Sequence, residues 1–188
     1  PNNHTRVIDA TSRYVIPGLI DCHVHLREPG LEYKETIETG SRAAAVGGYT
    51  TLICEPNTLP PIDSLEMVAS FMERGNQKGV VNIYTKACIT KGLLGEELTD
   101  IAKLATDKRV RALSDDGNPV FYESLMKRAC ELAAQSKLII SPHCEDSQIS
   151  LDKAKTNTNV AHFPGKPFCH ETDFVIREIK YTEQARGW

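Results

Sequence analysis

Residues 14–26, YVIPGLIDCHVHL, form an apolar run that ends in two histidines, and the pattern that they begin decides the fold. After a short loop come residues 34–48, KETIETGSRAAAVGG, which have helical periodicity, small residues that suit close packing and two final glycines that end the helix. The same order, a strand-length apolar run followed by a segment of helical period, recurs along the chain. The sequence therefore predicts a series of strand-helix units.

Four further units follow the first. We expect strands over residues 49–57, 80–90, 110–117 and 138–146, followed respectively by helices over residues 64–78, 96–108, 123–137 and 171–187. Ser64 is expected to cap the second helix, because its hydroxyl can accept from a free backbone N–H of the first turn. Repeated units of this kind imply parallel strands whose faces are covered by helices. A doubly wound sheet and a (β/α)8 barrel both satisfy this requirement.

The ends of the predicted strands favour the barrel. No GxGxxG motif or phosphate-binding loop follows the first strand, which argues against a nucleotide-binding doubly wound sheet. Polar residues instead recur where strands end, and in a barrel all carboxyl ends of strands meet at one mouth. We therefore predict an α/β fold, a partial (β/α)8 TIM barrel of about the first five βα units. A complete barrel takes about 250 residues, so 188 residues cannot supply eight units.

Composition narrows the class of protein. The formal net charge of -3 and a pI near 6.1 give no electrostatic reason to expect nucleic acid or an acidic membrane as a partner, since both would call for a basic patch. The polar N-terminal stretch lacks the apolar region of a signal peptide, and no run approaches the roughly 18 apolar residues of a membrane span. We expect a cytoplasmic protein that handles small molecules. The six cysteines are widely spaced and contain no CxxC pair, so we expect free thiols, several of them buried in strands.

His23 and His25 lie one residue apart at the end of the first predicted strand. Residues i and i+2 of a strand project to the same face, so both imidazoles point the same way, with Asp21 one pleat deeper. Two imidazoles on one face can bind one metal ion. An isolated HxH is about as often a pair of histidines satisfied by backbone hydrogen bonds. Carboxylate and imidazole groups at other strand ends favour the metal, because these are the ligands of catalytic zinc.

The other polar strand ends each have a plainer interpretation. Asp115 and Asp116 followed by glycine form a good turn sequence, and Asn57 also lies in a turn-like stretch. His143 could be a core histidine without a ligand. Arg27 can bind a carboxylate through two parallel hydrogen bonds, or it can pair with a nearby glutamate at the surface. Their joint occurrence at successive strand ends favours one site over separate turns.

Residues 7–30, VIDATSRYVIPGLIDCHVHLREPG, resemble the start of the barrel in cyclic amidohydrolases, and specifically in dihydroorotases of the bacterial type I group. Five later stretches are similar to that pattern in the same order, and together they cover essentially the whole chain: CEPNT, TKGLLGEEL, SDDG, PHCED and the helix that begins ETDFVIREI. The HxHxREPG stretch is shared with allantoinase-like relatives. SDDG is more specific, because many relatives bridge their metals with a carboxylated lysine where type I enzymes, like this chain, offer aspartate.

The resemblance implies a site and a reaction. His23 and His25 would bind one zinc, His143 would belong to a second, and Asp116 would bridge them or bind between them. The separation of 27 residues between Asp116 and His143 fits one helix and one strand, which favours Asp116 over Asp115. Arg27, Asn57 and His25 would hold the free carboxylate of the substrate.

The implied reaction is the zinc-dependent, reversible cyclisation of N-carbamoyl-L-aspartate to L-dihydroorotate, a step of de novo pyrimidine biosynthesis. One or two zinc ions would generate the nucleophile from water near neutral pH and stabilise the oxyanion. No catalytic residue can be assigned in this sequence, because the family's general acid/base aspartate is expected beyond Trp188. The same holds for a further zinc-binding histidine. We therefore expect a fragment of a longer enzyme.

Residues 1–14 resemble the tail end of a small β domain that flanks the barrel in relatives, and residues 15–188 resemble the N-terminal part of the barrel. Two alternatives stay open. One is another cyclic amidohydrolase, acting on hydantoin, allantoin or a dihydropyrimidine. The other is a non-catalytic scaffold that associates with a partner such as aspartate transcarbamoylase, and association into a homodimer is also left open. Retention of every ligand expected in this half argues against the scaffold.

Overall fold

Five parallel strands form one sheet in which neighbours in the chain are also neighbours in space. The structure is a computed structural model that describes residues 6–145 and 171–187. The strands pair in the order β1-β2-β3-β4-β5. Their bounds are β1 (Leu19–Val24), β2 (Tyr49–Cys54), β3 (Asn82–Ala87), β4 (Val110–Leu113) and β5 (Ile139–Ile140). A doubly wound sheet reverses its strand order part-way, whereas a barrel does not, so the observed order identifies part of a (β/α)8 barrel.

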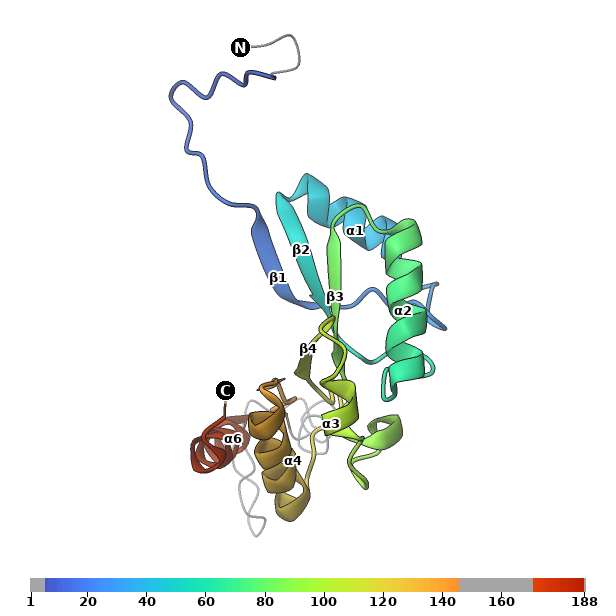
Figure 1. The fold of residues 1–188 in the computed structure, drawn as a ribbon, viewed down its shortest axis with the longest axis vertical. Coiled ribbons are helices and arrows are strands. Elements are labelled where there is room, and N and C mark those ends of the chain that lie inside the picture. The colour runs from blue at the N-terminus through green and yellow to red at the C-terminus, as the bar shows by residue number, and fades with distance from the viewer. Residues whose placement is uncertain (1–5, 146–170, 188) are drawn as a thin grey trace, which may run out of the picture.

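Helices follow the strands as predicted. The helices are α1 (Ile37–Val46), α2 (Leu65–Lys78), the short 3-10 helix η1 (Lys91–Leu93), α3 (Ile101–Leu104), α4 (Glu123–Ser136) and α6 (Glu171–Ala185). Figure 1 shows α1 and α2 on the same side of β1, β2 and β3, with α4 and α6 packed against each other near the end of the sheet. The faces of helices and strands meet in one apolar core, in which Leu52, Phe71 and Met126 are fully buried.

Local sequence explains where the first two helices begin and end. The Thr36 hydroxyl accepts from the backbone N–H of Thr39 at 3.1 Å and starts α1. Ser64 accepts from the N–H of Met67 at 3.3 Å, so its predicted role as the N-cap of α2 is confirmed. The chain leaves α1 through Gly48, whose φ of 84° is in the left-handed region that glycine tolerates best.

The predicted helix over residues 96–108 is wrong in its extent, because α3 covers only Ile101–Leu104. Thr90 and Leu98 form an antiparallel bridge, and the Thr99 hydroxyl donates to the carbonyl oxygen of Cys88 at 2.8 Å. These contacts hold the first residues of the expected helix as a loop against the end of β3. A side chain that satisfies distant backbone groups competes here with the helical hydrogen bonds.

The cysteines and the N-terminal residues can be compared with their predictions. The five described cysteines are free, and Cys54, Cys88 and Cys130 are buried, whereas Cys22 is exposed. Cys169 lies outside the described residues. Residues 6–18 contain no helix or strand, and their assignment to a flanking β domain stays a prediction. Among the described residues, no helix is both long and apolar enough to cross a membrane.

Candidate metal centre at the carboxyl ends of the strands

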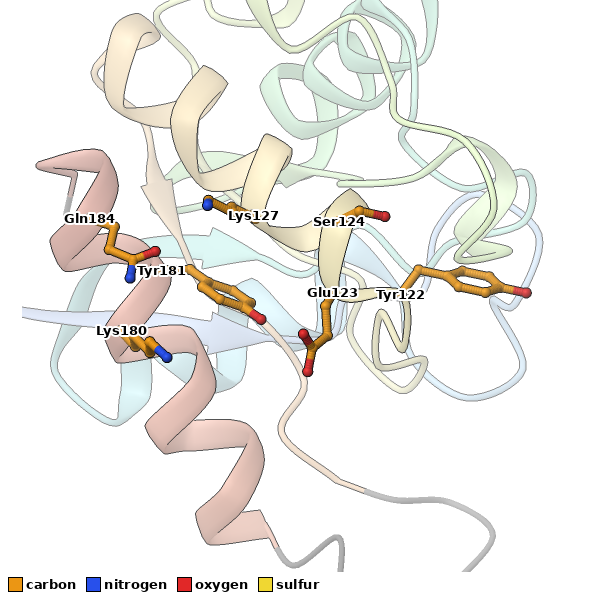
Figure 2. Close-up of a pocket in the computed structure, with 7 residues that line it drawn as sticks. All are labelled: Tyr122, Glu123, Ser124, Lys127, Lys180, Tyr181 and Gln184. Atoms are coloured by element: carbon orange, nitrogen blue, oxygen red, sulfur yellow. The ribbon is translucent and has the colours of Figure 1, made fainter.

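In the described part of the chain, polar side chains line a surface hollow and also gather at the edge of the sheet where the strands end. The first is a surface hollow of about 620 Å³ between α4 and α6 (Figure 2). It is lined by Tyr122, Glu123, Ser124, Lys127, Lys180, Tyr181 and Gln184. Burial and the neighbouring Glu123 raise the pKa of Tyr181. This hollow contains neither histidine nor cysteine, so its side chains are a poor set of zinc ligands.

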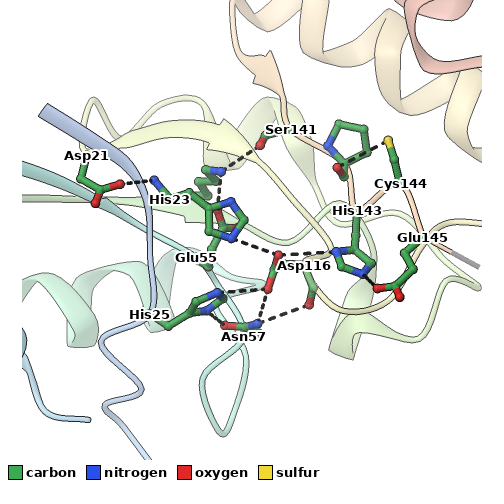
Figure 3. A network of polar contacts seen from close by, with 12 residues as sticks. Asp21, His23, His25, Glu55, Asn57, Asp116, Ser141, His143, Cys144 and Glu145 are labelled. Atoms are coloured by element: carbon green, nitrogen blue, oxygen red, sulfur yellow. Dashed lines mark hydrogen bonds and ion pairs between the residues drawn. The ribbon is translucent and has the colours of Figure 1, made fainter. Parts of the chain in front are cut away.

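The second place is the edge of the sheet where the strands end, and it gathers the residues singled out from the sequence. His23 comes from β1 and His25 follows it directly, while Asp116 stands three residues after β4. Figure 3 shows both imidazoles directed at the Asp116 carboxylate. His23 Nε2 lies 3.4 Å from Asp116 Oδ1, and His25 Nε2 lies 3.5 Å from Asp116 Oδ2. The predicted common face of the two histidines is therefore present.

The spacing of these atoms suits a metal ion. One ligand atom from each of His23, His25 and Asp116 can be chosen so that all three lie within 4.8 Å of one another. Ligand atoms on a tetrahedron about 2 Å from a zinc ion would stand roughly 3.3 Å apart. Two imidazoles and a carboxylate are also the donor types that zinc takes in catalytic sites. The residues present thus fit a divalent metal ion.

His143 lies on the far side of the same carboxylate. Its Nδ1 is 3.7 Å from Asp116 Oδ1, and its Nε2 is 3.1 Å from Glu145 Oε2. Asp116 therefore stands between the His23 and His25 pair at the end of β1 and His143, which follows β5 (Figure 3). A carboxylate with imidazoles around both of its oxygens is suited to bridge two ions. Of the two neighbouring aspartates, the structure places Asp116 among the histidines and Asp115 elsewhere.

Asn57 and Arg27 lie beside this group. The side-chain oxygen of Asn57 is 3.0 Å from His25 Nδ1, and its amide nitrogen donates to Asp116 Oδ2 at 2.7 Å. Arg27 donates from Nη1 to the backbone oxygen of Asn57 at 3.3 Å. In this structure the Asn57 amide is thus engaged by a histidine and an aspartate. The predicted substrate role of Asn57, Arg27 and His25 stays a prediction.

The turn that carries Arg27 is fixed by a glycine. Gly30 has a φ of 90°, and a side-chain carbon added there would stand 2.0 Å from the backbone oxygen of Leu59. The Leu59 N–H donates to the Pro29 oxygen at 3.0 Å, which ties this turn to the loop after β2. The last residue of the REPG stretch is therefore required by close backbone approach.

Sequence reasoning missed three polar residues at this edge, Glu55, Lys86 and Ser141. The Glu55 side chain is fully buried, its Oε1 lies 3.3 Å from His23 Nδ1, and the same oxygen accepts from Lys86 Nζ. Lys86 also donates to the Ser141 hydroxyl at 2.8 Å. The available signal was a charged residue inside or directly after an apolar strand, since such residues are rarely buried without a partner.

Comparisons with known proteins identify the family of this chain. The family model described as Dihydro-orotase-like matches residues 12–187. The chain belongs to the dihydroorotase-like family. This family member is 41% identical over 185 residues to the dihydroorotase of Ruminiclostridium cellulolyticum, covering 96% of this chain and 43% of that protein. It is 49% identical over 144 residues to the dihydroorotase of a Thermoanaerobacter species, covering 77% of this chain and 33% of that one. The chain thus spans less than half the length of these relatives.

Solved structures support the fold assignment of this dihydroorotase-like chain. The L-hydantoinase (dihydropyrimidinase) of Arthrobacter aurescens superposes with a TM-score of 0.76 at 21% identity, over 96% of this chain and 42% of that one. The dihydroorotase of Saccharomyces cerevisiae, solved with 5-fluoroorotic acid, superposes with a TM-score of 0.66 at 18% identity, over 92% of this chain and 46% of that one. At these identities the likeness shows the fold alone, and it confirms the predicted barrel architecture.

Proposed function

We propose that this chain carries the metal-binding half of a dihydroorotase, which interconverts N-carbamoyl-L-aspartate and L-dihydroorotate in pyrimidine biosynthesis. The observation that carries the proposal is Asp116. The first strand-end histidines and His143 surround an aspartate that follows β4, in the SDDG stretch that resembles type I dihydroorotases. The sequence identity of 41% to a dihydroorotase over nearly the whole chain supports the same reaction.

We assign His23, His25 and Asp116 to one zinc ion, and His143 with Asp116 to a second. Zinc bound there would lower the pKa of a water molecule and polarise the amide carbonyl of the substrate. The ligands that the protein provides are held in advance: Asn57 donates to Asp116 and contacts His25, so the carboxylate and one imidazole keep their relative orientation without the ion. Such support keeps ligands in a productive orientation.

Arg27 would hold the free carboxylate of the substrate. Its side chain is half-buried beside Asn57, and a guanidinium can bind a carboxylate through two parallel hydrogen bonds. One N–H group of Arg27 already donates to the Asn57 backbone, which orients the guanidinium and leaves its other donors for a ligand. His25, next to Asn57, would complete this carboxylate-binding group.

A second candidate function is hydrolysis of another cyclic amide, because hydantoinases are among the solved structures with the most similar fold. Turnover of L-dihydroorotate, allantoin and hydantoin by the intact enzyme, measured side by side, separates the candidates. We expect turnover of dihydroorotate, whereas turnover of hydantoin alone would contradict the proposal. Metal analysis of His23→Ala tests the ligands: we expect less zinc per chain than in the wild type, and equal zinc content would refute the assignment.

A further inference from the structure

Each histidine of the HxH pair has an oxygen acceptor behind it, and both acceptors come from the segment that leaves β2. His23 and His25 face Asp116 with Nε2. Their Nδ1 atoms face Glu55 Oε1 at 3.3 Å and Asn57 Oδ1 at 3.0 Å. The two acceptors are two residues apart, as are the two histidines, and Val24 pairs with Cys54, which brings the residues after β2 beside the end of β1. Figure 3 shows both contacts.

The acceptor behind His23 is the more tightly held of the two. The Glu55 side chain has no exposed surface, and Lys86, which is also buried, donates to its Oε1. Lys86 is held in turn by the Ser141 hydroxyl at 2.8 Å. Glu55 Oε2 has no hydrogen-bond partner among the described residues. A buried carboxylate costs free energy unless it is paired, and Lys86 is the partner that Glu55 has beside His23.

An acceptor oxygen next to Nδ1 decides which nitrogen of an imidazole carries the proton. Glu55 Oε1, 3.3 Å from His23 Nδ1, is placed to accept from Nδ1–H, and a proton on Nδ1 leaves the lone pair on Nε2. Metal-bound histidines usually have such a partner for the other ring nitrogen, and its loss weakens metal binding by about 10- to 100-fold. For His23, Nε2 is the nitrogen directed at Asp116.

We propose that Glu55, held by Lys86 and Ser141, is a positioning residue that keeps His23 in the Nδ1–H tautomer with Nε2 free for the metal. This inference rests on the proposed metal centre and adds to it a buried pair that acts through His23. Asn57 has the corresponding place behind His25. Through His23 and Ser141, the Glu55–Lys86 pair connects β1, β2, β3 and the end of β5 at the mouth of the barrel.

A purely structural role for the pair makes a different prediction. Replacement of a buried ion pair by apolar side chains of similar size is often neutral for stability. If Glu55 and Lys86 only fill space, the double substitution Glu55→Met and Lys86→Met should leave zinc affinity unchanged. If Glu55 positions His23, the same folded variant should bind zinc about 10- to 100-fold more weakly, because the methionine offers Nδ1 no charged acceptor.

The matched control is Glu28→Met with Lys78→Met. Glu28 is buried to the same degree and is paired with Lys78, but it contacts no histidine in the described structure. We expect its zinc affinity to equal that of the wild type. Zinc affinity would be measured in the intact enzyme by competition with a chromogenic chelator. A third variant, Glu55→Gln, keeps an acceptor oxygen without the charge and should fall between the wild type and the double variant.

The second readout is the ¹⁵N chemical shift of the His23 ring in the metal-free protein, assigned by comparison with His23→Ala. We expect the Nδ1–H tautomer in the wild type and a mixture of tautomers without Glu55. Equal zinc affinity and an unchanged tautomer in the Glu55 variants would overturn the inference. If the double variant does not fold, the Glu55→Gln spectrum and affinity decide. If the wild type binds no zinc, the proposed function fails, while the tautomer still tests Glu55.

Discussion

Two groups of buried carboxylates differ in what they contact. Glu55 and Asp116, the site carboxylates, both lie against imidazoles at the mouth of the barrel. Glu28 and Asp115, the scaffold carboxylates, accept instead from backbone N–H groups. Glu28 accepts from the first N–H of α1, and Asp115 accepts from two N–H groups in the loop after β3. All four follow strands, so position after a strand does not by itself make a carboxylate functional.

The contrast is sharpest between the adjacent residues Asp115 and Asp116. Asp115 is 1% exposed, and burial raises its pKa although hydrogen bonds from Thr90 and Ile89 oppose the shift. Asp116 meets His23, His25 and Asn57 instead. The path of the backbone after β4 therefore directs the Asp115 side chain to the neighbouring loop and the Asp116 side chain to the mouth of the barrel.

The largest expected effect comes from Asp115→Ala. The substitution leaves the N–H groups of Ile89 and Thr90 without their acceptor, and each such buried donor costs about 1–3 kcal/mol. We expect the free energy of unfolding to fall by about 2–6 kcal/mol, measured by urea denaturation, while the folded fraction still binds zinc. Asp116→Ala should do the reverse, losing zinc with a stability change of about 1 kcal/mol or less. Zinc loss in both variants would contradict the separation of site carboxylates from scaffold carboxylates.

A smaller effect is expected from Glu28→Gln. The glutamine keeps an acceptor for the Ile37 N–H but loses the charge that pairs with Lys78 and Arg74. Both cations are partly exposed and can be solvated by water, so we expect a loss of about 1–2 kcal/mol in thermal unfolding experiments. Zinc affinity should not change. A zinc affinity lowered as much as in the Glu55 variants would show that buried charge anywhere in this fold supports the metal.

The smallest effect concerns the reactivity of the exposed and the buried thiols. Burial raises the pKa of Cys130 to about 11 and raises the pKa of Cys54 and Cys88 further, so at about pH 8 these thiols are hardly ionised. We expect a thiol reagent to modify the exposed Cys22 and to spare these three until denaturant is added, as mapped by mass spectrometry. Of the three buried thiols, Cys130 should be the first whose modification becomes faster as the pH is raised, because its pKa is raised least.

Modification of Cys22 also tests which face of β1 carries the metal. Cys22 and His23 are consecutive, so their side chains project to opposite faces of the strand. We expect zinc content to survive the modification. Loss of zinc on modification of Cys22 alone would contradict the assignment of the metal to the inner face.

The alternation of apolar runs and helical segments was enough to predict five parallel strands, whereas the choice of a barrel over a doubly wound sheet depended on the polar residues at the strand ends. The alternation failed for residues 96–108, because Thr99 bonds to the backbone after β3 and no local pattern reveals that contact. The site was predictable in part: His23 and His25 share a face through strand geometry alone. Asp115 and Asp116 could not be told apart from local sequence, and the choice depended on spacing and resemblance.

The residues that could bind a metal can be read from the sequence, because imidazole and carboxylate groups follow successive apolar strands and parallel strands end on one edge of a sheet. The residues that support these ligands depend on the folded structure. In the register of β2 and β3, Cys54 pairs with Thr85, which brings the next residues, Glu55 and Lys86, together across 31 positions of sequence. Register is a property of two paired strands, so neither strand's sequence states it alone.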